Sequence, residues 1–215
     1  MIENERITDY LDSLCPGNSS ILEQIRKEAK AADIPMIRRD GEPFLKVLLA
    51  MKQPASILEI GTCTGYSALL MAENSTAQIT TLEIGEADYR KACENIRRAG
   101  YADRIHCIHT DATDYLETCR ERFDFVFMDA AKAQYIHWLP KVTELLLPGG
   151  ILLSDNVLHG GDIVESRFAV ERRDRTTHAR MRQYLYELTH SDQYITSVLN
   201  VADGMSVSVK KQRKT

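Results

Sequence analysis

Short apolar runs alternate with helix-like stretches through the middle of the chain. Apolar runs of strand length occupy 56–60, 78–84, 104–110, 123–129 and 150–155. Segments with helical periodicity lie between and after them, at about 66–74, 86–99, 112–120 and 132–146. Strands that alternate with helices of this length predict right-handed βαβ units and a buried parallel sheet.

The two ends of the chain follow different patterns. Residues 1–52 predict three helices, over about 7–14, 19–32 and 44–49, with Pro16-Gly17 and Pro35 as breaks between them. After Asp155, a polar loop with Gly160-Gly161 and a basic helix-like segment lead to strands at 194–200 and 205–211. The turn signal at 202–204 predicts that these two strands form an antiparallel hairpin. We therefore expect one α/β domain over 1–215, in which residues 1–52 form a helical cap.

Composition agrees with one folded domain. A chain of 215 residues with 44% apolar and 27% charged residues is long enough and apolar enough to bury a core. No apolar run approaches the roughly 18–20 residues that cross a bilayer, and the charged N-terminus does not resemble a secretory signal. The five Cys are scattered without a CxxC pair, which argues against a disulfide framework and a zinc cluster. A cytoplasmic protein that does not enter membranes is expected.

The first predicted strand leads into a loop with two glycines. The sequence LEIGTCTGYS over 58–67 leaves the strand, turns at Gly61 and Gly65 and enters a helix. Glycines let the backbone approach a ligand closely, and a helix N-terminus favours an anionic group. Glu83 ends the next strand, where a carboxylate can accept hydrogen bonds from ribose hydroxyls. These features indicate a nucleoside-containing cofactor. A dinucleotide is a weaker candidate because G-x-G-x-x-G spacing is missing, and a plain strand–helix turn is the alternative.

Carboxylates end the fourth and fifth predicted strands. Asp129 ends the fourth, with Lys132 just beyond it, and Asp155 and Asn156 end the fifth. If these strands are neighbours, two carboxylates and an amide oxygen converge at one edge of the sheet, as ligands suited to Mg²⁺ or a similar cation. The alternative is that both Asp residues cap the turns that follow. Beside a cation, the Lys132 ammonium loses its proton more readily, which suits proton abstraction.

Together these motifs give the chain a recognisable pattern. They are LEIGTCTGYSAL (58–69), Glu83 in TLEI, Asp111-Ala112, MDAAKAQY (128–135), SDNVLHGG (154–161) and DGMSVSVKK (203–211). Over about residues 34–210 the chain resembles the cation-dependent O-methyltransferases, which include catechol and caffeoyl-CoA O-methyltransferases. Within that family it looks most like the short bacterial branch that methylates 5-hydroxyuridine at the tRNA wobble position. The resemblance implies a Rossmann-like class I methyltransferase fold: a seven-stranded, mostly parallel sheet with a C-terminal antiparallel hairpin and N-terminal helices.

The resemblance also implies roles for individual residues. Those expected to bind S-adenosylmethionine are Ile37, Glu59, Gly61, Ser67, Glu83, Asp111, Ala112 and Asp129. In this assignment Glu59, Gly61 and Ser67 bound the methionine part, Glu83 holds the ribose, and Asp111 and Ala112 lie by the adenine. Asp129, Asp155 and Asn156 would hold Mg²⁺ or a similar divalent cation, and the catalytic residues would be Lys132 and Asp129. One departure from the family is His159, which contacts substrate or is a solvated loop residue.

Charge is distributed unevenly along the chain. The formal net charge of −4 disfavours nucleic acid at first sight, but residues 165–215 carry ten Lys and Arg against six Asp and Glu. The basic residues are Arg167, Arg172, Arg173, Arg175, Arg180 and Arg182, with a C-terminal basic tail beside them of Lys210, Lys211, Arg213 and Lys214. Such a patch, extended by Arg38 and Arg39, suits the phosphates of a tRNA anticodon loop while one base enters the cleft. A solvated helix face is the alternative.

Three functions are therefore open. The favoured one is Mg²⁺-dependent methylation of tRNA 5-hydroxyuridine to 5-methoxyuridine by a homodimer, since the resemblance implies a dimer. The second is a small-molecule catechol-type O-methyltransferase with the same chemistry. The third is a nucleoside-binding module without catalysis, or a nucleotide-dependent oxidoreductase.

Overall fold

The computed structural model describes residues 5–212, with side chains described for all of these except residues 5, 7–9, 12, 159 and 160. Its strands are β1 (Ser56–Ile60), β2 (Gln78–Glu83), β3 (Ile105–His109), β4 (Phe123–Met128), β5 (Leu146–Ser154), β6 (Tyr194–Leu199) and β7 (Met205–Lys210). Its α-helices are α1 (Glu5–Leu14), α2 (Ser20–Ala31), α3 (Glu42–Lys52), α4 (Tyr66–Glu73), α5 (Glu86–Arg98), α6 (Ala112–Thr118), α7 (Tyr135–Leu145) and α8 (Arg175–His190). Two 3₁₀ turns complete the elements, η1 (Lys132–Gln134) and η2 (His159–Val164).

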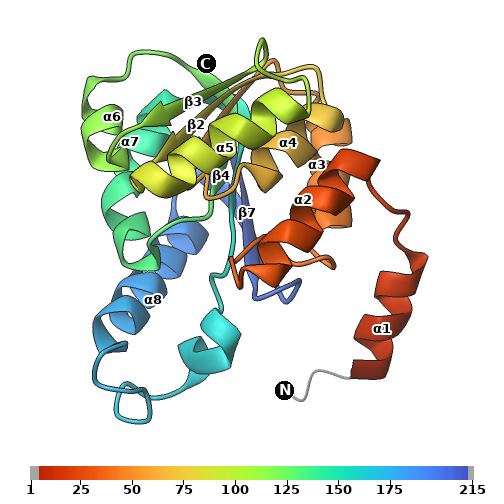
Figure 1. Ribbon diagram of the computed structural model, residues 1–215. Coiled ribbons are helices and arrows are strands. Elements are labelled where there is room, and N and C mark those ends of the chain that lie inside the picture. Colours follow the sequence, from red (N-terminus) through yellow and green to blue (C-terminus); the bar gives the residue numbers. More distant parts are fainter. Residues whose placement is uncertain (1–4, 213–215) are drawn as a thin grey trace.

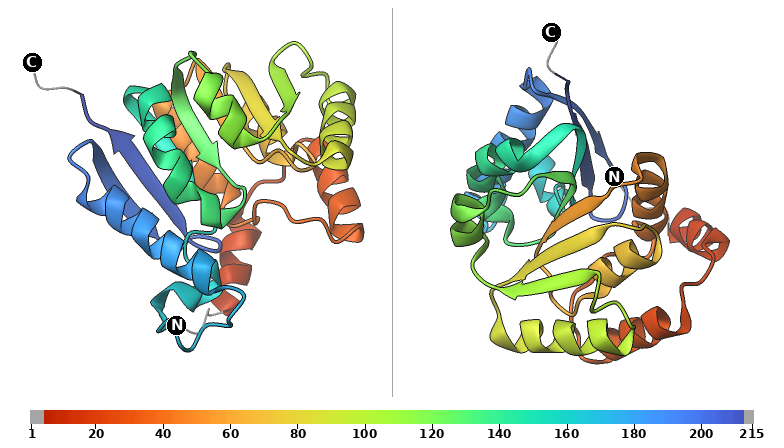
Figure 2. Two further views of the ribbon diagram at one scale, coloured as in Figure 1. Left: turned by 90° about the vertical axis from the view of Figure 1, so that its left-hand side faces the viewer. Right: turned by 90° about the horizontal axis from the view of Figure 1, so that it is seen from above.

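The seven strands form one sheet in the order β3-β2-β1-β4-β5-β7-β6 (Figures 1 and 2). The five strands β1 to β5 are parallel, and β7 runs antiparallel between β5 and β6. This confirms the predicted Rossmann-like α/β fold with a C-terminal antiparallel hairpin. The order reverses between β1 and β4, which is the position where open α/β sheets bind ligands.

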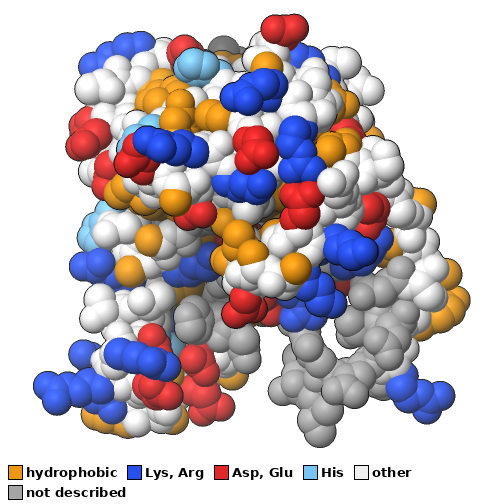
Figure 3. All heavy atoms as spheres, viewed as in Figure 1, with side chains coloured by type: hydrophobic (Ala, Val, Ile, Leu, Met, Phe, Trp, Pro, Cys, Tyr) orange, Lys and Arg blue, Asp and Glu red, His pale blue; other side chains and the backbone are white. Residues whose placement is uncertain are grey.

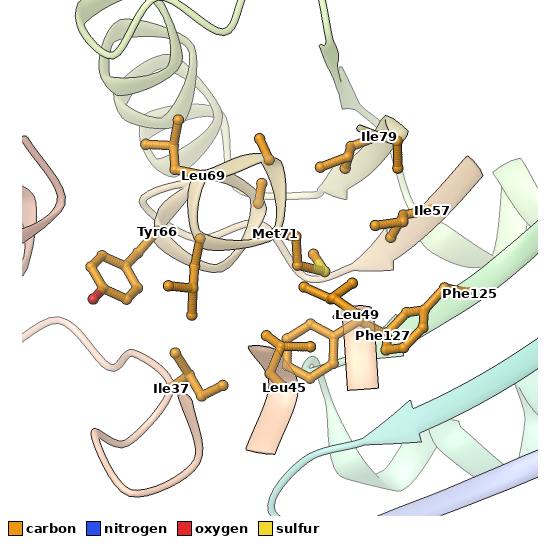
Figure 4. Packing of buried hydrophobic residues seen from close by; sticks show 14 of the residues in the cluster. Ile37, Leu45, Leu49, Ile57, Tyr66, Leu69, Met71, Ile79, Phe125 and Phe127 are labelled. Atoms are coloured by element: carbon orange, nitrogen blue, oxygen red, sulfur yellow. The ribbon is translucent and has the colours of Figure 1, made fainter. Parts of the chain in front are cut away.

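Helices cover the sheet on both faces because its strands are apolar on both sides. One core joins α2, α3, α4 and α5 to one face of the sheet, and α6, α7 and α8 form a second core on the other. Figure 4 shows part of the first core, in which Leu45 and Leu49 of α3 lie beside Phe125 and Phe127 of β4. These four side chains are at most 1% exposed. The two cores fix the strand ends that carry the predicted site.

The segment before β5 departs from the sequence prediction. A single helix was expected over 132–146 and a strand from residue 150, but η1 precedes α7 and β5 already begins at Leu146. Gly149 and Gly150 both lie inside β5, whereas the predicted strand began at Gly150, and the register with β4 shifts between Phe123 and Phe125. The glycines therefore accommodate an irregularity within the strand rather than its start. None of the helices in the described part of the chain has the length and apolarity that crossing a membrane requires.

The turn between β6 and β7 packs against the loop that follows β5. The backbone N–H of Val157 donates to the Gly204 carbonyl at 2.9 Å, and that of Leu158 donates to the Asp203 carbonyl at 3.2 Å. Gly204 has φ +89°, and a Cβ atom there would lie 2.3 Å from the Leu158 side chain. Only glycine permits this approach. The hairpin turn is thus fixed beside Asp155 and Asn156.

Candidate active site

A cleft of about 430 Å³ opens at the carboxyl ends of β1, β2, β3 and β4. Among the residues that line it are five of the predicted cofactor residues: Gly61, Glu83, Asp111, Ala112 and Asp129. They come from four successive strand ends, so the topology brings them together although they are up to 68 positions apart in the sequence. This is the edge at which parallel sheets place a ligand.

Gly61 brings the ends of β1 and β4 into contact. Its φ is +100°, and a Cβ atom at this position would lie 2.1 Å from the backbone oxygen of Asp129. No other residue fits this approach without displacing the β4 end. Gly61 therefore sets the distance between the glycine loop and the carboxylate on the neighbouring strand.

Glu83 fastens the glycine loop from the end of β2. One of its carboxylate oxygens accepts the N–H of Cys63 and the other accepts the N–H of Gly85, each at 2.8 Å. A carboxylate has about four acceptor positions, so both oxygens retain capacity for ligand hydroxyls. Since Glu83 lines the cleft, its location fits the predicted ribose contact.

Glu59 lies beneath the loop and is fully buried. Its Oε2 accepts a hydrogen bond of 2.5 Å from the Thr81 hydroxyl, while Oε1 has no partner within the described structure. Burial raises the pKa of Glu59 to about 8, against the lowering effect of the Ser67 and Thr81 hydroxyls. A buried carboxylate oxygen without a partner is costly. A cationic group of a ligand would supply the missing partner.

The other predicted cofactor residues differ in location. Asp111 is the N-cap of α6, where its side chain accepts the Thr113 N–H at 2.7 Å, and Ala112 is buried beside it. Glu59 and Ser67 are buried below the cleft and do not line it. Ile37 is 2% exposed, packs in the first core and is also absent from the cleft lining.

Two apolar side chains in the cleft were not predicted as part of the site. Trp138 of α7 lines the cleft and donates its ring N–H to the Thr113 hydroxyl at 3.2 Å. Ile84 also lines the cleft and is 67% exposed. The only sequence signal for Ile84 was an apolar residue directly after Glu83, and its exposure became visible only in the structure. Together the two side chains offer apolar contacts to a flat ring.

Asp129, Asp155 and Asn156 form an acidic edge of the sheet, which lies beside this cleft at the ends of β4 and β5. Asp129 Oδ1 accepts a hydrogen bond of 3.1 Å from Lys132 Nζ, and both side chains are about one-fifth exposed. Asp155 is 1% exposed; burial raises its pKa to about 7, and the negative charge of Asp129 adds to this effect. A buried carboxyl whose ionisation a neighbouring carboxylate disfavours is a group that a bound cation would stabilise in its ionised form.

Asn156 is the third predicted ligand. It has φ +56°, a left-handed conformation that asparagine tolerates, and its N–H donates to Asp155 Oδ1 at 2.7 Å. Its side-chain Nδ2 donates to Asp203 Oδ2 at 3.4 Å. In the described part of the chain, no three His, Cys, Asp or Glu side chains gather as a metal-binding group. A cation here would therefore depend on the Asn156 amide oxygen beside the two carboxylates, all three being oxygen donors suited to Mg²⁺.

Tyr135 supports the acidic edge from behind. Its buried hydroxyl accepts the Ala130 N–H at 3.2 Å and donates to the Met128 carbonyl at 3.0 Å. Burial raises the pKa of Tyr135 well above its ordinary value, so the hydroxyl keeps its proton. The side chain thus holds the backbone next to Asp129 in place.

Several of the arginines proposed to contact RNA make contacts within the protein. Arg180 donates to the Ala133 carbonyl in η1, and Arg182 donates to the Ile163 carbonyl in η2. Arg173 pairs with Glu171 and Asp174, and Arg175 donates to the Val170 carbonyl. Figure 3 shows basic and acidic side chains next to each other at the lower left, where Figure 1 places the segment before α8. Arg167 and Arg172 are exposed on this segment.

For the described residues of the basic tail, Lys210 and Lys211, the expectation that they lie beside these arginines is wrong. Ser206 pairs with Ser154 and Val209 pairs with Ile151, so β7 runs away from the cleft and Lys210 lies near the opposite edge of the sheet. Lys210 Nζ donates there to the carbonyls of Thr143 and Leu146, at the end of α7. Arg213 and Lys214 lie outside the described residues. Arg38 and Arg39 form ion pairs with Asp203 and Glu23, respectively.

Comparison with known proteins decides the family. The O-methyltransferase family matches residues 13–211, which is most of the chain. The chain belongs to this family. The match spans the glycine loop, the acidic edge and the terminal hairpin, so all the residues that form the candidate site lie within the family's common region.

Individual relatives agree with the family. The catechol O-methyltransferase of Mycobacterium tuberculosis is 32% identical over 72% of this chain and 73% of its own length. The caffeoyl-CoA O-methyltransferase of Eucalyptus gunnii is 33% identical over 76% of this chain and 70% of its own. Among solved structures, an O-methyltransferase of Bacillus cereus in complex with SAH has a TM-score of 0.84 and 26% identity, and covers 96% of this chain and 97% of that one.

Proposed function

We propose that this chain transfers a methyl group from S-adenosylmethionine, with a divalent cation, to one of two adjacent oxygens of its substrate. The observation that carries the proposal is the position of Asp129. Asp129 lines the cleft and its side chain contacts Lys132. Its negative charge also raises the pKa of Asp155. Donor cleft, base and acidic edge are therefore contiguous.

The residues around the cleft fit the donor. Glu83 offers acceptor positions to ribose hydroxyls, and the unpartnered Oε1 of buried Glu59 offers one to a cationic amine. Trp138 and Ile84 supply apolar contacts for a base. The related Bacillus cereus structure contains SAH, the demethylated form of such a donor. These features support S-adenosylmethionine as the ligand of the cleft.

The acidic edge fits the acceptor chemistry. Asp129, Asp155 and Asn156 would hold the cation, which when bound supplies Lewis-acid stabilisation of a deprotonated substrate oxygen. Lys132 Nζ would accept the proton from the reacting hydroxyl, and Asp129 holds Nζ at 3.1 Å. Tyr135 keeps the strand ends in place, so that donor and acceptor are held in fixed positions, which contributes much of the rate of such reactions.

Two substrate classes present two adjacent oxygens. A 5-hydroxyuridine in tRNA offers O5 beside O4, and exposed Arg167 and Arg172 support contacts with RNA phosphates. A catechol-type small molecule offers two ring hydroxyls, and the names of the catechol and caffeoyl-CoA relatives support this class. We propose the tRNA substrate as the first to test and the small molecule as its competitor.

A methyl-transfer assay tests both levels of the proposal. The purified protein is incubated with S-adenosylmethionine and Mg²⁺, and with either hydroxyuridine-containing tRNA or catechol and caffeoyl-CoA; products are measured by mass spectrometry. We expect 5-methoxyuridine from the tRNA, and loss of activity in EDTA or in Asp129→Ala with donor binding partly retained. Methylation of catechols alone would favour the small-molecule class, and full activity in EDTA would exclude the cation mechanism.

A further inference from the structure

The side chains of Arg38, Asp203 and Asn156 form a chain of contacts at the acidic edge. Arg38 Nη1 lies 2.8 Å from Asp203 Oδ1, and Asn156 Nδ2 lies 3.4 Å from Asp203 Oδ2. The two oxygens of one carboxylate thus bridge the segment before α3 and the loop after β5. Asp203 is neither a predicted cation ligand nor part of the cleft lining.

The Asp203 carboxylate determines which way the Asn156 amide faces. An ionised carboxylate only accepts hydrogen bonds, whereas the two ends of an amide differ, one donating and the other accepting. The NH₂ end of Asn156 must therefore face Asp203, which leaves Oδ1 at the opposite end of the amide group. Oδ1 is the atom that a hard cation would bind. Rotation of the amide by half a turn would bring two oxygens together and present NH₂ to the cation.

Arg38 holds Asp203 in the position this requires. The pair is about one-third exposed on each side, and Arg38 Nε also lies 3.3 Å from Asp40 Oδ1, which restrains the guanidinium. The backbone of the turn is fixed independently, because the Asp203 and Gly204 carbonyls accept from Leu158 and Val157. Substitution of the Asp203 side chain therefore leaves the main-chain contacts of the turn available.

We infer that Asp203, held by Arg38, is a positioning residue that orients the Asn156 amide oxygen toward the cation. The inference rests on the proposed cation-dependent function. Groups that orient metal ligands without touching the metal commonly change metal affinity by about 10-fold to 100-fold when removed. Asp203 would thus affect the reaction only through the orientation of Asn156, and not through contact with substrate.

Binding of Mn²⁺ alone, followed by the electron paramagnetic resonance of the free ion, tests this role. We expect Asp203→Asn to weaken Mn²⁺ binding about 10-fold and Arg38→Gln to weaken it several-fold. The matched control is Arg39→Gln, which removes a neighbouring arginine that pairs with Glu23 instead and should leave the affinity unchanged. Calorimetry with S-adenosylmethionine in EDTA should give wild-type affinity for all three variants, which shows that the fold and the cleft are intact.

Arg38→Gln separates orientation from simple charge. Removal of a positive charge near the site would by itself tighten cation binding, so a field effect and an orienting effect predict opposite signs. Tighter or unchanged Mn²⁺ binding in Arg38→Gln, or unchanged Mn²⁺ binding in Asp203→Asn, would overturn the inference. The proposed function would still stand in that case, provided that the wild-type protein binds Mn²⁺. If wild-type protein does not bind Mn²⁺, or Asp129→Ala binds it equally well, the proposed cation dependence itself fails and the inference with it.

Discussion

The buried Glu59 side chain lowers the stability of the fold but offers an acceptor oxygen to a ligand. It is a buried carboxyl with one oxygen bonded to Thr81 and the other without a partner in the described structure. Polar groups in this condition cost about 1–3 kcal/mol, and they recur at functional sites. A side chain that disfavours the ligand-free protein thus keeps one oxygen available as an acceptor for a cationic part of the donor.

We expect Glu59→Gln to stabilise the ligand-free protein at alkaline pH. The folded pKa of about 8 exceeds the ordinary value of 4.5, so between these pH values the unfolded state loses the proton and the folded state keeps it. Wild-type stability therefore falls as pH rises through this window. Gln cannot ionise, and the variant should gain about 4 kcal/mol at pH 8 and little at pH 4.5.

Urea unfolding at the two pH values measures this difference. Calorimetry above the pKa of about 8, where Glu59 is ionised, should show weaker binding of S-adenosylmethionine by the same variant, because the neutral amide offers no charge to an ammonium group. Equal pH dependence of unfolding in variant and wild type would contradict the assignment.

Gly61 gives a second prediction for a single residue. Gly61→Ala places a methyl group against the Asp129 backbone and should destabilise the protein by more than about 3 kcal/mol. Gly100→Ala is the matched control, because Gly100 also has positive φ but no atom within 4 Å of its missing Cβ. It should cost only the conformational term of about 1–2 kcal/mol. Thermal unfolding measures both, and equal losses would show that the close approach is unimportant.

The sequence predicted site residues that belong to a motif, but it could not predict residues whose role depends on a contact made by the fold. Gly61, Glu83 and Asp129 follow strand ends, and strand ends of a parallel sheet meet at one edge. Trp138 and Asp203 gave no such signal, because an apolar helix residue and a hairpin turn have the same pattern whether or not a ligand lies beside them. Their importance depends on which elements the fold brings next to them.

At the scale of elements, α8 fastens two segments that flank the acidic edge. Arg180 donates to η1, which begins with Lys132, and Arg182 donates to η2, which follows Asn156. A run of arginines before and within a helix indicated a solvent or RNA contact, and periodicity gives no information on backbone acceptors elsewhere in the fold. In the structure Arg180 and Arg182 therefore support neighbouring segments, although the sequence had grouped them with a binding surface.

Arg182→Gln should loosen η2 without unfolding the protein. Loss of a hydrogen bond from a charged donor costs about 1.5–3 kcal/mol, so amide exchange in residues 161–174 should accelerate roughly tenfold. Hydrogen exchange followed by mass spectrometry measures this, with exposed Arg172→Gln as the control on the same segment. The same rate in both variants would mean that Arg182 does not hold the segment.

For the whole molecule, the fold class was predictable because the alternation of strands and helices indicates βαβ units and a parallel sheet. The distance between the arginines before α8 and Lys210 was not predictable. Charge along the sequence does not reveal that antiparallel β7 places Lys210 at the edge opposite the cleft. The homodimer expected from the family resemblance stays a prediction, which sedimentation equilibrium would test. Binding of tRNA, if it occurs, should depend on the cleft edge alone.

Salt dependence of tRNA binding tests that statement. The double variant Arg167→Gln and Arg172→Gln should weaken binding and lower the slope of log affinity against log salt concentration by about 2. Lys211→Gln, which removes an equally exposed charge beyond the far end of β7, should leave binding and slope unchanged. Filter binding at several salt concentrations measures both; an equal effect of Lys211→Gln would mean that RNA does not distinguish the two edges.

The contact between the hairpin turn and Asn156 also orders events during synthesis. Arg38, Asn156 and Asp203 are translated in that sequence, and at about 5–20 residues per second the ribosome adds Asp203 several seconds after Asn156. Until then the nascent chain holds the strand ends that carry Asp129 and Asp155, yet nothing orients the Asn156 amide. If Asp203 orients Asn156 as proposed, the cation site reaches its full affinity only after β7 has entered the sheet.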